Sequence, residues 1–375
     1  MDIQPFHVNI PQSALDDLQN RLMRTRWPNE LPDVGWSYGV PLRYVRRLHD
    51  YWCTGYDWRT WEAKLNAYPQ FITEIDGQTI HFLHVRSPEP DARPLILTHG
   101  WPGSVFEYIK VIDPLSNPRA YGGDPKDAFH LVIPTLPGFG FSGPTREPGW
   151  NPDRIAKAWI TLMQGLGYER YGVAGNDWGS IISPQLGRFA PANVAGTHVT
   201  QIFLAPSGDP AEFADPTPED RIAMAGLDWF KQNMSAYDTL QSQQPQTLAY
   251  ALSDSPMGLL AWFCQIYREG EGIDDDFVLT NVSLYWLTET IGSSARIYYE
   301  ANHSKPSAES IASSNTPLAL AMFRDDGRAF RRLADRAYTN IVQWTEFDTG
   351  GHYGAYQVPD LLVSDVRKFF RTIGY

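Results

Sequence analysis

The chain is poor in cysteine, and it lacks long hydrophobic runs. Only Cys53 and Cys264 occur, far apart and outside any CxxC or Cys/His spacing, which disfavours a disulfide framework and a zinc site. The first residues, MDIQPFHVNIPQSALDD, have neither the basic nor the apolar part of a signal peptide. No stretch reaches the roughly 18 uninterrupted apolar residues that a membrane span needs. We therefore expect a cytoplasmic protein without a membrane anchor.

Positively charged residues are also fewer than negatively charged ones. The chain has 31 Lys and Arg against 43 Asp and Glu, a formal net charge of −12. Such a surface repels polyanions, so we expect no nucleic-acid partner. Repeats and low-complexity tracts are lacking too. With 43% hydrophobic and 20% charged residues in 375, the composition is that of an ordinary globular protein.

The first 90 or so residues predict helices followed by a hairpin. Ser13 and Asp16 have the spacing of a capping box ahead of an apolar helical face. A second helix is expected from about Pro41 and a third over Trp58–Asn66. Phe71–Val85 resembles two strands joined at an Asp-Gly turn.

Beyond residue 90 the pattern changes to short apolar strands, each followed by a loop and a helical stretch. This order is typical of βαβ units in a parallel sheet, whose active sites lie at the carboxyl ends of the strands. The expected strands are Pro94–Thr98, His130–Pro134, Tyr171–Gly175, Val199–Leu204, Pro317–Phe323 and Ile341–Phe347.

A block of about a hundred mainly helical residues interrupts the strands after Leu204. Because strands resume afterwards, we interpret the block as a lid inserted into an α/β core rather than a separate helical domain. The expected division is an N-terminal segment (1–90), the first part of the core (91–207), the lid (208–314) and the second part of the core (315–375).

The motif Gly175-Asn-Asp-Trp-Gly179 follows one of the predicted strands. It has the form of a nucleophile elbow, in which small neighbours allow a strained turn to expose the central residue. Here that residue is Asp177, whose carboxylate can attack a saturated carbon and form an ester. The competing interpretation is that Asp177 only caps the following helix.

The loop His99-Gly-Trp-Pro102 follows the first core strand. Hydrolases with such elbows donate a second backbone N–H from this position to an oxyanion. The amides of Trp101 and Trp178 are therefore candidates for an oxyanion hole.

His352 follows the last predicted strand and a pair of glycines. The chain order of nucleophile, acid and histidine is the one that this kind of fold uses. The acid that orients the imidazole should end the strand before it, which leaves Asp325 and Asp326. Asp209, after an earlier strand, is a third candidate.

Several motifs together resemble the epoxide hydrolases related to the microsomal enzyme, and the likeness runs almost end to end. They include TRWP, YWCTGYDWR, HGWPGS, GFGFSGP, GNDWGS and GGHYGAYQVPD. The resemblance implies an α/β-hydrolase fold with a mostly parallel central sheet flanked by helices, a helical lid and an N-terminal segment that wraps the core and lid. It also implies a small-molecule epoxide as substrate, no cofactor or metal, and a possible homodimer.

Site residues follow from the same resemblance. It places the nucleophile at Asp177, the catalytic histidine at His352 and the acid at Asp326, although Arg324 stands where relatives often have Pro and leaves Asp325 open. Two lid tyrosines of the family polarise the epoxide oxygen. They match Tyr237 and Tyr298, with Tyr299 as the alternative to Tyr298.

Two other functions remain open at this point. A haloalkane or haloacid dehalogenase shares the fold, the Asp nucleophile and the histidine, and Trp178 suits both because an indole N–H can hold a halide. The paired tyrosines favour an epoxide, whose oxygen needs an acidic hydroxyl. A catalytically inactive binding protein with this fold is the other alternative.

Overall fold

The computed structural model describes residues 1–204, 207, 209–270 and 272–375. Its strands form one sheet in the order β1-β2-β3-β5-β4-β6-β7-β8-β9. The pairs from β5 onward are parallel, whereas β1, β2 and β3 are added antiparallel at one edge. The α/β-hydrolase fold with a mostly parallel sheet is therefore confirmed. The strands are β1 (Ile3–Phe6), β2 (Gln70–Ile75), β3 (Gln78–Val85), β4 (Arg93–Thr98), β5 (Phe129–Pro134), β6 (Tyr171–Gly175), β7 (Val194–Val199), β8 (Leu318–Met322) and β9 (Ile341–Glu346).

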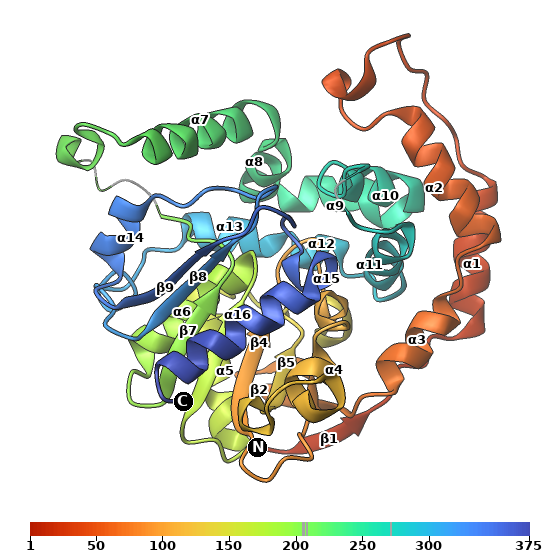
Figure 1. Cartoon of the computed structure of the whole chain (residues 1–375). Coiled ribbons are helices and arrows are strands. Elements are labelled where there is room, and N and C mark those ends of the chain that lie inside the picture. The colour runs from red at the N-terminus through yellow and green to blue at the C-terminus, as the bar shows by residue number, and fades with distance from the viewer. Residues whose placement is uncertain (205–206, 208, 271) are drawn as a thin grey trace.

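Helices cover both faces of this sheet and its upper edge (Figure 1). The α-helices of the N-terminal segment and core are α1 (Gln12–Met23), α2 (Leu42–Thr54), α3 (Trp58–Asn66), α4 (Ile112–Ser116), α5 (Pro152–Gly165), α6 (Trp178–Phe189), α14 (Arg331–Ala337), α15 (Gly354–Gln357) and α16 (Pro359–Thr372). Between β7 and β8 lie α7 (Pro218–Asn233), α8 (Ala236–Gln243), α9 (Pro245–Asp254), α10 (Pro256–Cys264), α11 (Asp275–Leu287), α12 (Ile291–Ser294) and α13 (Arg296–His303), which we call the lid helices. Short 3-10 turns occur at Gly35–Tyr38, Val105–Tyr108, Pro118–Tyr121, Pro125–Asp127, Gly140–Ser142 and Pro210–Phe213.

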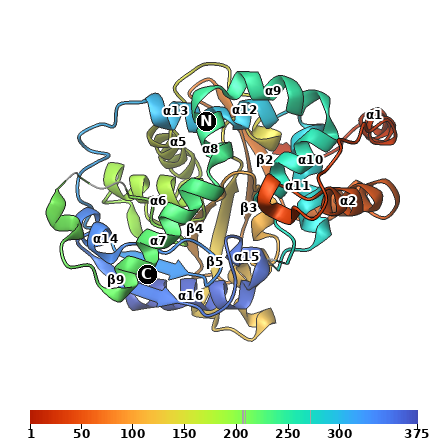
Figure 2. The same cartoon turned by 90° about the horizontal axis from the view of Figure 1, so that it is seen from above.

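The core is layered in the manner of a doubly covered sheet. Seen from above, α5 and α6 lie on one side of the strands and α16 on the other (Figure 2). β6 and β7 are buried throughout, the polar Thr197 and His198 of β7 included, because helices exclude water from both faces of the sheet. The lid helices lie over the ends of these strands (Figure 1).

Two local predictions are wrong, and one strand was missed. The strand expected over Val199–Leu204 instead spans Val194–Val199, so the residues after Val199 form a loop. The first helix starts at Gln12 after Pro11 and has no side-chain cap, so Ser13 is not a capping residue. The N-terminal strand β1 was not expected, and it pairs with β2 at the edge of the sheet.

The N-terminal helices lie along the lid as well as the core, at the right of Figure 1. The Trp52 indole N–H donates to Ser283 Oγ on α11 at 3.1 Å. The Tyr44 hydroxyl donates to the carbonyl of Tyr267, just after α10, at 2.9 Å. These bonds attach the first segment of the chain to helices that lie more than two hundred residues away in sequence.

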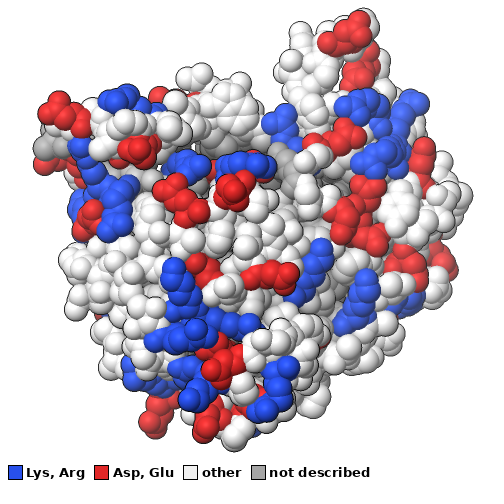
Figure 3. Space-filling view, in the orientation of Figure 1, with Lys and Arg blue, Asp and Glu red and all other residues white. Residues whose placement is uncertain are grey.

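The surface shown in Figure 3 carries intermixed positive and negative side chains and is hollowed at the top, between α7 and the N-terminal segment. None of the described helices is both long and apolar enough to cross a membrane. The expected division at residues 90/91 falls in the loop between β3 and β4. The first residue of the expected lid, 208, lies outside the described residues.

Candidate active site

Asp177 occupies a strained turn between β6 and α6. Its backbone has φ 55° and ψ −119°, a conformation that L-residues rarely adopt. A Cβ at Gly179 would lie 1.8 Å from the carbonyl oxygen of Thr98, and one at Gly175 would lie 2.3 Å from that of Gly179. The small neighbours that the motif predicted are therefore required. Asp177 stands at the N-cap position, but its side chain makes no capping hydrogen bond, so the interpretation as a simple helix cap is wrong.

The Asp177 carboxylate is held between a backbone amide and an imidazole. The N–H of Trp101 donates to Oδ1 at 2.8 Å, and His352 Nε2 lies 3.6 Å from Oδ2. A Cβ at Gly100 would lie 2.1 Å from Oδ1, so the HGWP loop can approach the carboxylate only because this residue is glycine. Trp178, the other expected oxyanion residue, is the first residue of α6.

The other ring nitrogen of His352, Nδ1, contacts Asp326. His352 Nδ1 and Asp326 Oδ1 are 3.2 Å apart, and the Gly327 N–H donates to the same oxygen at 2.8 Å. His352 lies between β9 and α15, and Asp326 lies in the loop after β8, so strand ends bring both to Asp177.

The competing acids lie elsewhere. Asp325 is 48% exposed and pairs with Arg324 at 2.9 Å. Asp209 is exposed in the loop after β7, where its N–H donates to Ser207 Oγ. The structure therefore brings Asp326, and neither alternative, to the imidazole.

Burial and opposite charges shift the pKa values of His352 and Asp326. Burial acts to lower the pKa of His352, but the charge of Asp326 and hydrogen bonds with Asp177 and Asp326 raise it well above its ordinary value. Burial acts to raise the pKa of Asp326, but the charge of His352 and hydrogen bonds to the carboxylate hold it below its ordinary value. Both acidic neighbours therefore stabilise positive charge on the imidazole when it takes up a proton.

Four aromatic rings lie beside the carboxylate of Asp177. Tyr237 on α8 stacks on Trp101, with ring centroids 5.4 Å apart and an angle of 15°. Tyr298 on α13 meets Trp178 edge-on at 4.8 Å. The two tyrosine rings are 6.0 Å apart and nearly perpendicular. The lid thus brings both expected tyrosines to the elbow.

Burial and the negative charge of Asp177 raise the pKa of both Tyr237 and Tyr298 above the ordinary tyrosine value. The phenols therefore stay protonated and can donate hydrogen bonds. Tyr299, the alternative to Tyr298, is 39% exposed and stacks on His303 instead.

Sequence reasoning missed a buried polar network behind the elbow. Gln201, in the loop after β7, contacts both the backbone of Asp177 and the carboxylate of Asp326. Asn176 joins Gln201 to Glu107, whose pKa burial raises to about 8. The signal that could have found Gln201 is its place just after a strand end, but the strand was expected to run through it.

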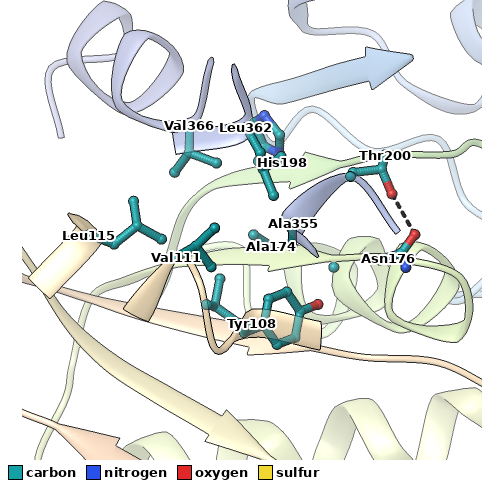
Figure 4. Close-up of a pocket in the computed structure, with 13 residues that line it drawn as sticks. Tyr108, Val111, Leu115, Ala174, Asn176, His198, Thr200, Ala355, Leu362 and Val366 are labelled. Atoms are coloured by element: carbon teal, nitrogen blue, oxygen red, sulfur yellow. Dashed lines mark hydrogen bonds between the residues drawn. The ribbon is translucent and has the colours of Figure 1, made fainter. Parts of the chain in front are cut away.

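A small cavity of about 20 Å³ lies behind β6, with room for about one water molecule (Figure 4). Its lining is mainly apolar, with Tyr108, Asn176, His198 and Thr200 contributing polar groups. In Figure 4 the Thr200 hydroxyl points to the side-chain oxygen of Asn176, at 2.8 Å. The cavity therefore adjoins the network and not the reacting face of Asp177.

Comparisons with known proteins agree on one family. A family model for the epoxide hydrolase N terminus matches residues 3–108, and one for the α/β-hydrolase fold matches residues 93–250. A relative from Stigmatella aurantiaca, provisionally named an epoxide hydrolase, is 44% identical over 99% of this chain and 85% of its own. Epoxide hydrolase 1 of Sus scrofa is 30% identical over 98% of this chain and 88% of its own.

Solved structures give the same answer. Epoxide hydrolase from Aspergillus niger has a TM-score of 0.87 at 29% identity, covering 100% of this chain and 97% of that one. Juvenile hormone epoxide hydrolase from Bombyx mori has a TM-score of 0.88 at 26% identity, covering 100% and 95%. By sequence over nearly its whole length and by fold, this chain belongs to the epoxide hydrolase family.

Proposed function

We propose that this enzyme adds water to an epoxide to give a vicinal diol, through an ester on Asp177. One observation carries the proposal. A carboxylate in a strained turn faces one buried and one partly buried phenol on one side and a histidine-aspartate pair on the other. This arrangement supplies a nucleophile for carbon, acids for an epoxide oxygen and a base for water.

In the first half-reaction, Tyr237 and Tyr298 donate hydrogen bonds to the epoxide oxygen. Asp177 attacks one ring carbon, a C–O bond of the ring breaks, and the alkoxide takes a proton from one phenol. Protonated phenols suit this task, since they donate strongly while the ring oxygen gains charge.

In the second half-reaction, His352 removes a proton from water, which attacks the ester carbonyl. Ester formation removes the charge of Asp177, one of the causes that raise the pKa of His352, so the imidazole becomes neutral more easily when a base is needed. Asp326 keeps the ring oriented and balances its returning charge.

The tetrahedral intermediate needs donors for its oxyanion, and the N–H groups of Trp101 and Trp178 would supply them. The Trp101 N–H already lies 2.8 Å from Asp177 Oδ1, which supports this role. When the intermediate collapses, His352 returns its proton to the departing alkoxide, and the proton left on the Asp177 carboxyl restores the phenol. Neither half-reaction as written requires a metal or an organic cofactor.

The substrate that we propose is a small apolar or aromatic epoxide. The site walls next to Asp177 are aromatic rings, which favour apolar ligands with few polar groups. We also propose a cytoplasmic location, a homodimer and the four-part division of the chain. The exposed side chains of Ile222 and Trp229 on α7 give a homodimer an apolar surface to cover.

A dehalogenase is the rival function, and the leaving group separates the two. A halide requires indole N–H donors, whereas an epoxide oxygen requires acidic hydroxyls, and Tyr237 and Tyr298 bring two phenols beside Trp101 and Trp178. An inactive binding protein is disfavoured because nucleophile, base, acid and both phenols occur together.

The test is to incubate the purified protein with styrene oxide and with a short haloalkane, beside Asp177→Asn and His352→Ala variants. We expect diol from the epoxide alone, an inactive Asp177→Asn variant, and an ester-linked adduct on the His352→Ala variant, seen by mass spectrometry of the Asp177 peptide. Halide release, or diol formation by Asp177→Asn at the wild-type rate, would contradict the proposal.

A further inference from the structure

Gln201 links the backbone of Asp177 to the carboxylate of Asp326 from behind the candidate active site. It is 3% exposed and lies two residues after the end of β7. The backbone N–H of Asp177 donates to its Oε1 at 2.8 Å. On the other side its Nε2 donates to Asp326 Oδ2. One amide therefore connects the strained elbow to the acid that faces His352.

The orientation of this amide follows from its partners. A backbone N–H can only donate, so the atom facing Asp177 must be the side-chain oxygen. A carboxylate that lacks a proton can only accept, so the atom facing Asp326 must be the NH₂ group. The Ser180 hydroxyl donates to Oε1 at 2.9 Å, which adds a second donor on the oxygen side. Rotation of the amide would place like groups against each other at both ends.

Neighbouring side chains hold the amide in place. Its Nε2 also donates to Asn176 Oδ1 at 2.8 Å, and the Thr200 hydroxyl lies 2.8 Å from the same oxygen, as Figure 4 shows. Asn176 in turn donates to Glu107 Oε2 at 3.1 Å, and Glu107 is 1% exposed. Because each of these groups is buried and bonded, the network resists rearrangement.

We propose that Gln201 is a positioning residue for ester hydrolysis, which fixes the Asp326 carboxylate so that one oxygen is free to face His352. This role rests on the function proposed above. With Oδ2 held by Gln201, Oδ1 points to His352 Nδ1 at 3.2 Å. Without that bond the Gly327 N–H still holds the carboxylate, but its orientation toward the imidazole is less tightly fixed.

If Gln201 acts in ester hydrolysis, a variant without its hydrogen bonds should slow that half-reaction more than ester formation. In Gln201→Met the side chain keeps about the same length but makes no hydrogen bond to Asp326. We expect hydrolysis of the ester to slow by about ten-fold, the usual effect of losing a hydrogen bond to a charged group. Ester formation should fall less, because the Trp101 N–H still holds the Asp177 carboxylate. The ester should therefore accumulate during turnover.

For a second variant, the rate of ester hydrolysis should depend on pH in a way that a purely structural role would not produce. In Gln201→Glu the introduced carboxyl can donate to Asp326 only while it is protonated. When it ionises, two carboxylates face each other. Hydrolysis by this variant should fall as pH rises, whereas in the wild type it should rise or stay level as His352 becomes neutral.

The experiment is rapid-quench single turnover of styrene oxide by the full chain, with the two half-reactions measured separately from pH 5 to 9. Gln78→Met is the matched control, since Gln78 is also buried and bonded to a backbone carbonyl but lies on β3. The control should keep the wild-type ratio of the two rates even if its melting temperature falls.

The outcomes separate this proposal from the general function. If the wild type forms no ester, the proposed function fails. If the wild type forms it but Gln201→Met slows both steps equally, or slows ester formation alone, the role of Gln201 in hydrolysis is overturned. A Gln201→Glu profile parallel to that of the wild type would also overturn it.

Discussion

Tyr298 and Tyr299 are neighbours on α13 but lie in different surroundings. Tyr298 is 4% exposed and meets the Trp178 ring edge-on at 4.8 Å. Tyr299 is 39% exposed and stacks on His303, one helical turn further along. The two differ little in sequence context, so this pair offers a test in which each variant is the control of the other.

Removing the Tyr298 hydroxyl should slow ester formation by about a hundred-fold, the effect of losing one donor to a developing oxyanion. The Tyr298→Phe variant keeps the ring that packs on Trp178, so its stability should change little. Tyr299→Phe should react as the wild type does. Single-turnover rates of styrene oxide measure both, and equal rates for the two variants would contradict the proposed role of Tyr298.

The adjacent acids Asp325 and Asp326 form a second matched pair. Asp326→Asn should reduce ester hydrolysis by between about 10² and 10⁴-fold, because a neutral amide neither balances the imidazolium nor fixes its tautomer. Asp325→Asn removes only a surface pair with Arg324 and should keep full activity. Steady-state diol formation distinguishes them, and a larger loss in Asp325→Asn would mean that the acid has been assigned to the wrong residue.

Gly100 should tolerate no side chain, because a Cβ there would lie 2.1 Å from Asp177 Oδ1. The Gly100→Ala variant must displace either the loop or the nucleophile. A displacement of about 1 Å costs on the order of a hundred-fold in rate. Gly226→Ala on α7, where a Cβ meets nothing within 4 Å, is the control. Diol formation by Gly100→Ala at the rate of the control would show that the close approach has no functional importance.

The buried Glu107 should make the free energy of unfolding depend on pH. Burial raises its pKa to about 8, from an ordinary value of 4.5. Between these values the folded protein keeps a proton that the unfolded chain releases, so rising pH lowers the free energy of unfolding. Glu107→Gln has no such proton and should gain stability relative to the wild type as pH rises from 5 to about 8.

Urea unfolding at pH 5, 6.5 and 8 measures this difference. Glu309→Gln, at an exposed position, is the control and should follow the wild type. If the curves for Glu107→Gln and the wild type stay parallel, the folded protein does not hold this proton.

The sequence predicted most of the site because its residues lie in short motifs at strand ends. Asp177 lies between glycines whose Cβ atoms would collide with backbone, so the local chemistry of the elbow is visible in five consecutive residues. The choice between Asp325 and Asp326 was harder, because either residue follows the strand. Only the direction of the loop after β8 separates them, and that direction depends on its contacts with the loop around Gly350, whose carbonyl accepts from the Asp325 N–H.

Gln201 shows what sequence patterns could not supply. The apolar residues around it favoured a strand over Val199–Leu204, whereas the strand ends at Val199. Its importance comes from partners at positions 177 and 326, and no local pattern encodes such distant contacts. β1 was missed for a similar reason, since a four-residue edge strand gains its stability from pairing with β2, across more than sixty residues of chain.

The bonds from Tyr44 and Trp52 to the lid have a consequence for building chimaeras between relatives. A lid exchanged alone would meet a foreign N-terminal segment, and the buried Trp52 indole would lose its acceptor on α11. The unit that can be exchanged is therefore made of two stretches separated by most of the core sheet. The three crossover points, one after α3 and two around the lid, should therefore be chosen together rather than by position along the sequence.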